Sequence, residues 1–417
     1  MGKQRMKKSC SFGEKLPLRA AVMLIVVLWA LAAAGAGADT KLMVVSDLHY
    51  LEPSLYRESD YFLRALRRGD GKATQYGEEL MAALYRTVFT ERPDALIVTG
   101  DLTFNGEQLS HRALSEWFAK VEDAGIPVWV IPGNHDINTS NSVGYGDGMI
   151  YRVEGTSPEV FAAVYADYLE MGEAGFSYTA KISDELWVAM TDVAIYQDEA
   201  ATPGLFSSRH AEWLEGVLQD ARKEDVRVVT ATHHGLLVHT ELYRDNFVMY
   251  GSESMASLCR AYGVKMNLSG HLHIQHIARE DGLADAALGA FCMWPHRYAV
   301  VTLRDDGTLV YDAKALDGHF LPEGISDRSR EWFAGITADK AKTGLSGTGD
   351  EIEMMAEYAA RFNLAYFSGT YRKDDPSWTE DPAYAIWKER GNTPFTAYMM
   401  MVMNEETGDN LGLVVGE

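Results

Sequence analysis

Residues 41–49 read Lys-Leu-Met-Val-Val-Ser-Asp-Leu-His, an apolar run of strand length that ends in a carboxylate and an imidazole. A short run rich in apolar and β-branched residues is typical of a buried strand. Four later stretches repeat the arrangement, a strand-like run followed directly by polar side chains: 95–101, 128–136, 227–234 and 265–273. Because helical stretches separate these runs, the pattern predicts an α/β fold with a mostly parallel or mixed sheet.

The other periodic segments define the extent of this domain. Amphipathic spacing predicts helices over Glu78–Thr90, Glu107–Ala124, Ser207–Arg222 and Glu253–Tyr262. After His273, consecutive strand-like runs cover Ile274–Arg279, Ala284–Leu288, Tyr298–Leu303 and Leu309–Ala313. Beyond about residue 320 the strand signals stop and the patterns are helical. We therefore predict a main domain over 39–320 and a helical C-terminal extension over 321–417 that packs on it or partly caps it.

The first 38 residues have the composition of an export signal. Basic residues precede the apolar run Ala20 to Ala34, and small residues follow it up to Ala38. The run is shorter than the roughly 20 residues of a membrane span. We predict a cleaved signal peptide over 1–38 and a protein that acts outside the cytoplasm, in the periplasm, at the cell surface or beyond it. Membrane attachment would follow only if the signal stayed uncleaved.

Charge and cysteine content exclude several classes. The chain has 38 Lys and Arg against 60 Asp and Glu, a net charge of −22, so binding to nucleic acid duplexes is not expected. An acidic protein that handles a phosphate needs a local cation, either a bound metal or an Arg/Lys cluster.

Cys259 and Cys292 lie outside the predicted signal. We expect two buried free thiols, although an oxidising compartment would permit a disulfide.

The polar residues at the strand ends are of the types that bind metal ions. They are Asp47 and His49; Asp101; Asn134, His135 and Asp136; His233 and His234; and His271 and His273. In open α/β sheets, ligand sites form at the carboxyl ends of the strands, so these residues have one plausible meeting place. Carboxylate, amide and imidazole donors without thiolates suit divalent Mn, Fe, Zn or Ni.

The order of these motifs, D-x-H, G-D, G-N-H-D, H and G-H-x-H, resembles that of the calcineurin-like metallophosphoesterase superfamily over roughly residues 41–315. The resemblance implies a four-layer α/β/β/α sandwich with two divalent metal ions and hydrolysis of phosphate esters. By that resemblance Asp101 bridges the metals. Asp47, His49 and His273 complete one metal site, and Asn134, His233 and His271 complete the other.

The resemblance also implies a mechanism. Two metals roughly 3.5 to 4 Å apart hold a bridging water or hydroxide and clamp the phosphoryl oxygens. His135 points at the scissile phosphate as proton donor or charge stabiliser, and Asp136 orients its ring. His233 is favoured over His234 as the ligand because related proteins use the first His of such a pair. The lone residues His111, His210 and His319 are expected at the surface.

Three functions remain open from the sequence. We favour an exported phosphodiesterase for small diesters of the cyclic nucleotide or glycerophosphodiester type, because the loop after Asp101, Leu-Thr-Phe-Asn-Gly, contains no Arg. A phosphomonoesterase would use the same metals and gain from such a cation. A non-catalytic, metal-containing surface protein is the third reading. Aromatic residues of the segment Tyr243 to Tyr250 either contact the substrate's organic part or pack locally. The oligomeric state is open.

Overall fold

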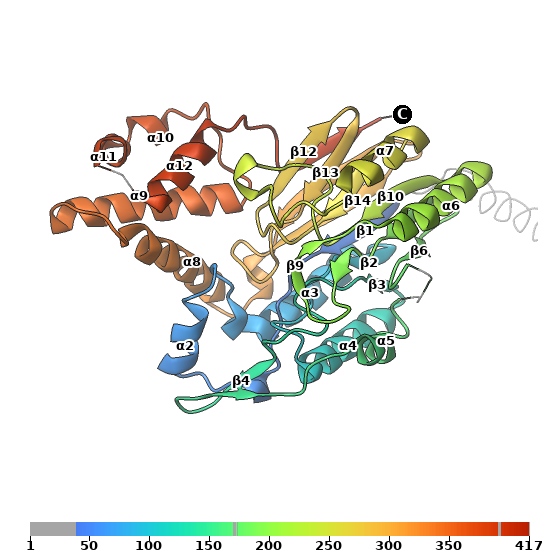
Figure 1. Cartoon of the computed structure of the whole chain (residues 1–417), viewed down its shortest axis with the longest axis horizontal. Coiled ribbons are helices and arrows are strands. Elements are labelled where there is room, and N and C mark those ends of the chain that lie inside the picture. The colour runs from blue at the N-terminus through green and yellow to red at the C-terminus, as the bar shows by residue number, and fades with distance from the viewer. Residues whose placement is uncertain (1–38, 170–171, 173, 391–392, 417) are drawn as a thin grey trace, which may run out of the picture.

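Two six-stranded sheets form the centre of the computed structural model, which describes residues 39–169, 172, 174–390 and 393–416 (Figure 1). The predicted export signal, residues 1–38, lies outside the described residues and stays a prediction. Within the described part of the chain, no helix is both long and apolar enough to cross a membrane.

The first sheet contains the strand that opens the domain. Its order is β16-β15-β14-β1-β2-β3. The strands are β1 (Thr40–Val45), β2 (Ala95–Val98), β3 (Val128–Val130), β14 (Arg297–Leu303), β15 (Leu309–Ala315) and β16 (Gly412–Val415). β1, β2 and β3 are parallel, and β14 runs antiparallel to β1. The carboxyl ends of the three parallel strands therefore lie at one edge.

The second sheet has the order β12-β13-β11-β10-β7-β6. Its strands are β6 (Tyr178–Lys181), β7 (Leu186–Met190), β10 (Arg227–Ala231), β11 (Met266–Ser269), β12 (His276–Glu280) and β13 (Leu283–Ala287). β7, β10, β11 and β13 are parallel, whereas β6 and β12 are antiparallel edge strands. Parallel strands buried on both faces read as continuous apolar runs, which is why the sequence revealed them.

The two sheets pack face to face between two layers of helices. One core cluster joins both sheets, with Val44 and Ile97 from the first and Val229 from the second, and residues of α3 (Gly77–Glu91) and α4 (Gln108–Glu122) belong to it. A second cluster covers the opposite face of the second sheet with α6 (Ser208–Glu224) and α7 (Ser252–Tyr262). The predicted α/β/β/α sandwich is confirmed.

Several short elements were not predicted, because they lie in loops without long periodic patterns. The helical ones are η1 (Pro53–Leu55), α2 (Asp60–Leu66), η2 (Thr74–Tyr76), α5 (Pro158–Val164), η3 (Glu241–Tyr243) and η4 (Gly318–Phe320). The extended ones are β4 (Val143–Tyr145), β5 (Ile150–Arg152), β8 (Ala194–Ile195) and β9 (Ala201–Gly204).

The C-terminal part is helical, as predicted, and we call residues 325–404 the C-terminal module. Its helices are α8 (Ile325–Lys342), α9 (Gly349–Phe367), α10 (Ser377–Glu380), α11 (Pro382–Arg390) and α12 (Pro394–Asn404). Tyr358, Phe362, Trp387 and Met399 are fully buried in its core. In Figure 1 these helices project to one side of the two sheets.

One expectation about this region was wrong, because strand structure does not end at residue 320. β16 follows the C-terminal module and pairs antiparallel with β15, Leu309 opposite Val415. An edge strand of four residues carries almost no periodic signal of its own, so its formation depends on the tertiary contact with β15. The module is therefore connected to the first sheet at both ends.

Cys259 and Cys292 are buried free thiols, as expected, and do not form a disulfide with each other. Burial raises the pKa of Cys259 to about 12. The thiol therefore stays protonated at neutral pH and behaves as a small apolar side chain.

Candidate metal centre

The polar loops that follow the strands meet between the carboxyl ends of the two sheets. Asp47 and His49 follow β1, and Asp101 follows β2. The first two loops are joined through their backbones, because the Asp47 and His49 N–H groups donate to the Gly100 and Asp101 carbonyls, both at 3.0 Å. Two groups of buried side chains result, each with ligand atoms within 4.8 Å of one another. One contains Asp47, His49, Asp101 and His273; the other contains Asp101, His233 and His271.

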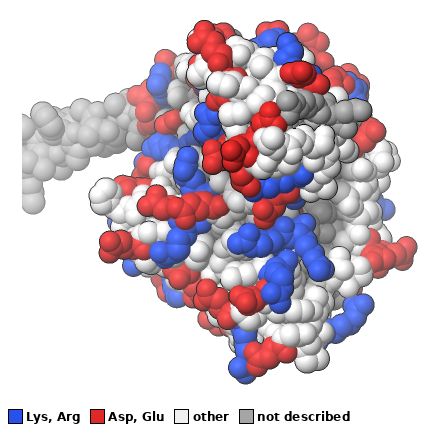
Figure 2. Space-filling model, turned by 90° about the vertical axis from the view of Figure 1, so that its left-hand side faces the viewer, with Lys and Arg blue, Asp and Glu red and all other residues white. Residues whose placement is uncertain are grey.

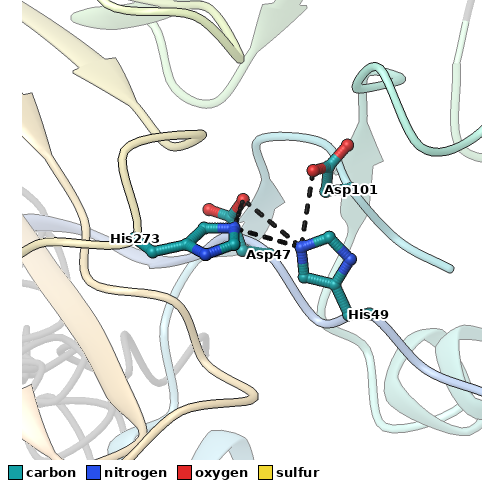
Figure 3. A group of neighbouring side chains, drawn as sticks. All are labelled: Asp47, His49, Asp101 and His273. Carbon is teal, nitrogen blue, oxygen red and sulfur yellow. Dashed lines mark hydrogen bonds and ion pairs between the residues drawn. The ribbon is translucent and has the colours of Figure 1, made fainter. Parts of the chain in front are cut away.

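The first group is compact, and its donor atoms face one point (Figure 3). His49 Nε2 lies 3.1 Å from His273 Nε2 and 3.4 Å from Asp101 Oδ2. His273 Nε2 also lies 3.2 Å from Asp47 Oδ1. Two imidazole nitrogens and two carboxylates this close suit a shared cation, because the nitrogen lone pairs would otherwise repel one another.

The second group shares Asp101 with the first. His233 Nε2 lies 3.3 Å from Asp101 Oδ1 and 3.2 Å from the amide oxygen of Asn134. Asp101 thus presents Oδ2 to the first group and Oδ1 to the second, which is the geometry of a bridging carboxylate. Because His271 Nε2 donates to the Asn246 carbonyl at 3.1 Å, its Nδ1 is left for a metal. The residues fit two divalent cations.

The backbone at these positions is strained. Asp47, His49, Asp101, His271 and His273 all have positive φ, between 41° and 63°. Residues other than Gly or Asn rarely adopt this region, and each instance costs about 1–3 kcal/mol. Such strain persists where the surrounding structure fixes it, and its concentration at one place marks a functional site.

Two glycines of the motifs are required by close approach rather than by backbone conformation. A Cβ atom on Gly133 would collide with the Asp101 carboxylate and with His233. A Cβ atom on Gly270 would collide with Ser46 and with the Asp47 carboxylate. These glycines let the β3 and β11 loops approach the carboxylates that join the two groups.

Hydrogen bonds made by Nδ1 fix the ring orientation of two of the histidines. His233 Nδ1 donates to the Thr99 carbonyl at 2.8 Å, and His273 Nδ1 donates to Asp70 Oδ2 at 2.8 Å. In both residues Nε2 therefore faces the donor group, as metal-binding histidines require. Asp70 lies in the loop between α2 and η2 and was not predicted.

The charges of the site agree with cation binding. Burial raises the pKa of Asp101, but the neighbouring His233 and His135 outweigh burial and hold it well below the usual value. Burial lowers the pKa of His49 and His271, and neighbouring basic side chains, Lys72 beside His49 and His234 beside His271, lower it further. Asp101 is therefore a carboxylate and these two imidazoles are neutral, the forms in which they bind metals.

His234 does not join either group. Its Nε2 donates to the Thr202 carbonyl at 2.8 Å, and its ring packs on that of His271 with centroids 4.3 Å apart. The structure thus brings His233, and not His234, to the shared carboxylate. The side chain of His234 supports the ring of His271 from behind.

His135 borders the first group, its ring centroid 4.9 Å from that of His49. Its backbone N–H donates to Asp101 Oδ1 at 2.9 Å. Its Nδ1 lies 3.0 Å from both the Phe104 carbonyl and the Asn105 amide oxygen. Because Nδ1 donates to these oxygens, Nε2 is the atom that can exchange a proton with a ligand.

The role predicted for Asp136, orienting the His135 ring, was wrong. The Asp136 carboxylate accepts from the backbone N–H groups of Gly133, Leu102 and Thr103 at 2.8 to 3.1 Å. Successive residues of this tight loop point in different directions, so Asp136 joins the β2 and β3 loops instead. It supports the site through the backbone rather than through His135.

The expectation that His111 lies at the surface was also wrong. It is fully buried, and it bonds the Asp136 carbonyl and the Tyr165 hydroxyl, each at 2.9 Å. Burial lowers its pKa to about 4, so it is neutral. His111 precedes Leu114 by three residues and Phe118 by seven, a helical spacing that could have assigned it to the buried face of α4. By contrast, His319 is exposed, as expected.

Replacing Asp70 by Ala should lower the metal affinity of the first group by about 10- to 100-fold, the usual effect of losing the carboxylate behind a metal-binding histidine. The Nδ1 proton of His273 would lose its acceptor, and the ring its fixed orientation. Titrating metal-free protein with Mn²⁺ by calorimetry would measure this, and an Asp70→Asn variant, which keeps an acceptor, should fall between. Unchanged affinity for both metals in the Ala variant would show that Asp70 does not support metal binding through His273.

Comparison with known proteins is consistent with this geometry. Residues 40–275 match the family model described as calcineurin-like phosphoesterase. Residues 327–409 match the model described as the C-terminal domain of cyclic nucleotide phosphodiesterase. No curated protein matches the chain.

Among solved structures, a dimetal phosphatase from Danio rerio is similar over 66% of this chain and 96% of its own, with 14% identity and a TM-score of 0.51. A Staphylococcus aureus protein assigned as a 5′-nucleotidase is similar over 72% of this chain and 58% of its own, with 13% identity and a TM-score of 0.41. At 14% identity, the likeness to the Danio rerio phosphatase shows the fold alone. Because the first family model covers more than half of the chain, the protein belongs to the calcineurin-like phosphoesterase family, whose members are phosphoester hydrolases with two divalent metal ions.

Proposed function

We propose that the protein is a phosphodiesterase that cleaves cyclic nucleotides in preference to glycerophosphodiesters. The observation that carries the proposal is the C-terminal module, which matches the model of the cyclic nucleotide phosphodiesterase C-terminal domain and lies against the loops of the metal centre. A phosphomonoesterase with the same metals is the alternative.

A cavity of about 220 Å³ lies between the C-terminal module and the main domain. Half of its ten lining residues are aromatic, and four are polar or charged. They are Asp70 and Tyr243 from the main domain, and Phe333, Ile336, Thr337, Lys340, Asn363, Phe367, Phe395 and Tyr398 from α8, α9 and α12. Aromatic walls stack with flat ring systems, and such stacking contributes about 1–3 kcal/mol per base. This lining suits a nucleobase better than glycerol.

One side chain lies between the cavity and the first ligand group, and two lie between the cavity and the second. Asp70, in its wall, is bonded to His273 of the first group. Tyr243, also in its wall, packs against Phe247 at a centroid distance of 4.9 Å, and Phe247 packs against His271 of the second group at 5.1 Å. An ester held at the metals could therefore place its organic part against the module.

Metal binding and proton transfer are assigned to different residues of the chain. When bound, the two metals supply an activated water and neutralise the phosphoryl oxygens. The side chains that would hold the metals are those of Asp47, His49, Asp101, Asn134, His233, His271 and His273. His135 Nε2 takes up a proton from solvent, which makes the ring an imidazolium, and donates that proton to the oxygen that leaves the phosphorus. The Phe104 carbonyl, which accepts from Nδ1, keeps the ring in the required orientation.

A substrate panel tests the proposal. Manganese-loaded protein should show its highest kcat/KM on a 3′,5′-cyclic nucleotide, followed by a glycerophosphodiester and then a nucleoside monophosphate. Phe395→Leu, which keeps apolar bulk but removes the ring, should raise KM for the cyclic nucleotide by about tenfold, given the stacking energy. It should leave the glycerophosphodiester unaffected.

Phe89→Leu is the matched control, because Phe89 is an exposed aromatic residue of α3 in the main domain. A highest kcat/KM on the monophosphate would favour the monoesterase. Equal effects of Phe395→Leu on both diesters would exclude the cavity as a base site. No turnover of any ester by fully loaded protein would leave the non-catalytic reading.

A further inference from the structure

A lysine that sequence reasoning did not select lies close to the metal centre. Lys72 belongs to the loop between α2 and η2, and only 16% of its side chain is exposed. Its nearest carboxylate is Asp70, with Nζ 3.6 Å from Oδ2, beyond hydrogen-bond range. Among the described residues, none accepts a hydrogen bond from this ammonium. A largely buried ammonium whose three donors are not taken up by protein acceptors is available to bind an anionic ligand.

The ammonium lies close to the first ligand group. Asp70 Oδ2, its neighbour, also accepts the Nδ1 proton of His273. After burial, the Lys72 charge is the largest influence on the pKa of His49, which it lowers. Burial lowers the pKa of Lys72, but nearby carboxylates, Asp70 first, outweigh burial and raise it, so the side chain stays charged.

The C-terminal module fixes the backbone of this loop. The Lys72 carbonyl accepts from Trp332 Nε1 at 3.1 Å, and the Gly69 carbonyl accepts from Lys340 Nζ at 2.7 Å. Gly71 between them has φ of 112°, and a Cβ atom there would collide with the Phe333 ring. Three residues of α8 thus contact three positions of the loop, Gly69, Gly71 and Lys72.

On its other side the loop is attached to the main domain, because the Ala73 N–H donates to the Cys292 carbonyl at 2.8 Å. Figure 2 views the molecule from the side on which α2 and α8 lie in Figure 1. Lys and Arg side chains gather near the middle of this face, with Asp and Glu around them. On a chain with a net charge of −22, such a gathering favours the approach of an anion from this side.

We propose that Lys72 binds a phosphoryl oxygen of the ester and that α8 of the C-terminal module positions it to do so. Lysine supplies a compact point charge with three donors, which suits one phosphoryl oxygen. It takes the place of the cation that the loop after Asp101 lacks. The inference rests on the proposed phosphoester substrate, but it concerns binding rather than turnover.

The test measures inorganic phosphate binding to manganese-loaded protein by calorimetry, together with metal content. Lys72→Met should weaken phosphate binding by about 10- to 100-fold, the range expected for one hydrogen bond to a charged group. It should raise KM for the diester similarly, and leave two metals bound. Lys72→Arg should recover part of the affinity. Lys314→Met is the matched control, because Lys314 is a partly exposed lysine paired with Glu91 outside the metal centre.

The role of α8 has its own variant. Trp332→Phe keeps an aromatic ring but removes the N–H that holds the Lys72 carbonyl. It should weaken phosphate binding by about threefold to tenfold, the range for one neutral hydrogen bond. If Trp332→Phe binds phosphate as tightly as wild type, α8 does not position Lys72.

The outcomes separate this proposal from the proposed function. Phosphate affinity that is equal in wild type and Lys72→Met, with both metals bound, overturns the role of Lys72. Wild-type protein that binds phosphate through Lys72 but cleaves no cyclic nucleotide supports the role of Lys72 and refutes the proposed activity instead.

Discussion

Replacing Asp101 by Asn should lower kcat/KM by more than about 10³-fold, the upper range for loss of one electrostatic group in an active site. Asp101 is the only residue shared by the two ligand groups, with Oδ2 facing His49 and Oδ1 facing His233. Asn has nearly the same shape but provides one neutral oxygen. Two cations held side by side would then lose the charge between them, so both metal sites should weaken together.

Metal content measured by mass spectrometry after dialysis, alongside diester turnover, would check this result. Asp192→Asn is the matched control, since Asp192 is also a buried carboxylate after a strand. Burial raises its pKa to about 6, so a neutral side chain should cost less there than at Asp101, whose pKa is lowered. An Asp101→Asn protein that retains both metals would contradict the bridging geometry, and equal metal loss in the control would point to general unfolding.

Replacing His135 by Ala should lower kcat by about 10²- to 10⁴-fold while both metals stay bound. Among the described residues, the His135 ring forms no hydrogen bond or ion pair with Asp101. The hydrogen bond to Asp101 comes from the His135 backbone N–H, which Ala keeps. The ring instead presents Nε2 as a proton donor, held by the Phe104 carbonyl and Asn105.

The leaving group gives this prediction a sharper test. An ester that releases nitrophenolate needs little protonation, so the variant should lose far less activity on it than on a cyclic nucleotide, whose alkoxide must be protonated. His210→Ala serves as control, because His210 caps α6 at Ser207 and belongs to neither ligand group. Normal turnover of the cyclic nucleotide by His135→Ala would remove the residue from the mechanism, and loss of metal would make it a structural support.

The residues that directly follow strands could be predicted from the sequence. Asp47 and Asp101 each come after an apolar run, and parallel strands in one sheet deliver their carboxyl ends to one edge. His271 follows β11 of the second sheet, so its place beside them also depends on how the two sheets pack. The helices α3, α4, α6 and α7 were predictable for a similar reason, because their apolar faces repeat with helical spacing.

Asp70 and Lys72 could not be found in this way. They stand in a Gly-Asp-Gly-Lys turn after a short helix, a pattern that occurs in ordinary loops. What brings them to the metal centre is α8, more than 250 residues later, through contacts that no local pattern records. β16 escaped prediction for the same reason, and the partner of the His135 ring depended on loop directions that only the tertiary structure sets.

The pairing of β16 with β15 has a mechanical consequence for the C-terminal module. The module enters from β15 and returns to β16, which is the neighbouring strand of the same sheet. The module is inserted between two neighbouring strands and is therefore attached to the sheet at both of its ends, not at one. To rotate away as a swinging lid it would have to peel an edge strand from the sheet, so a broken peptide bond within the module would still leave both fragments attached.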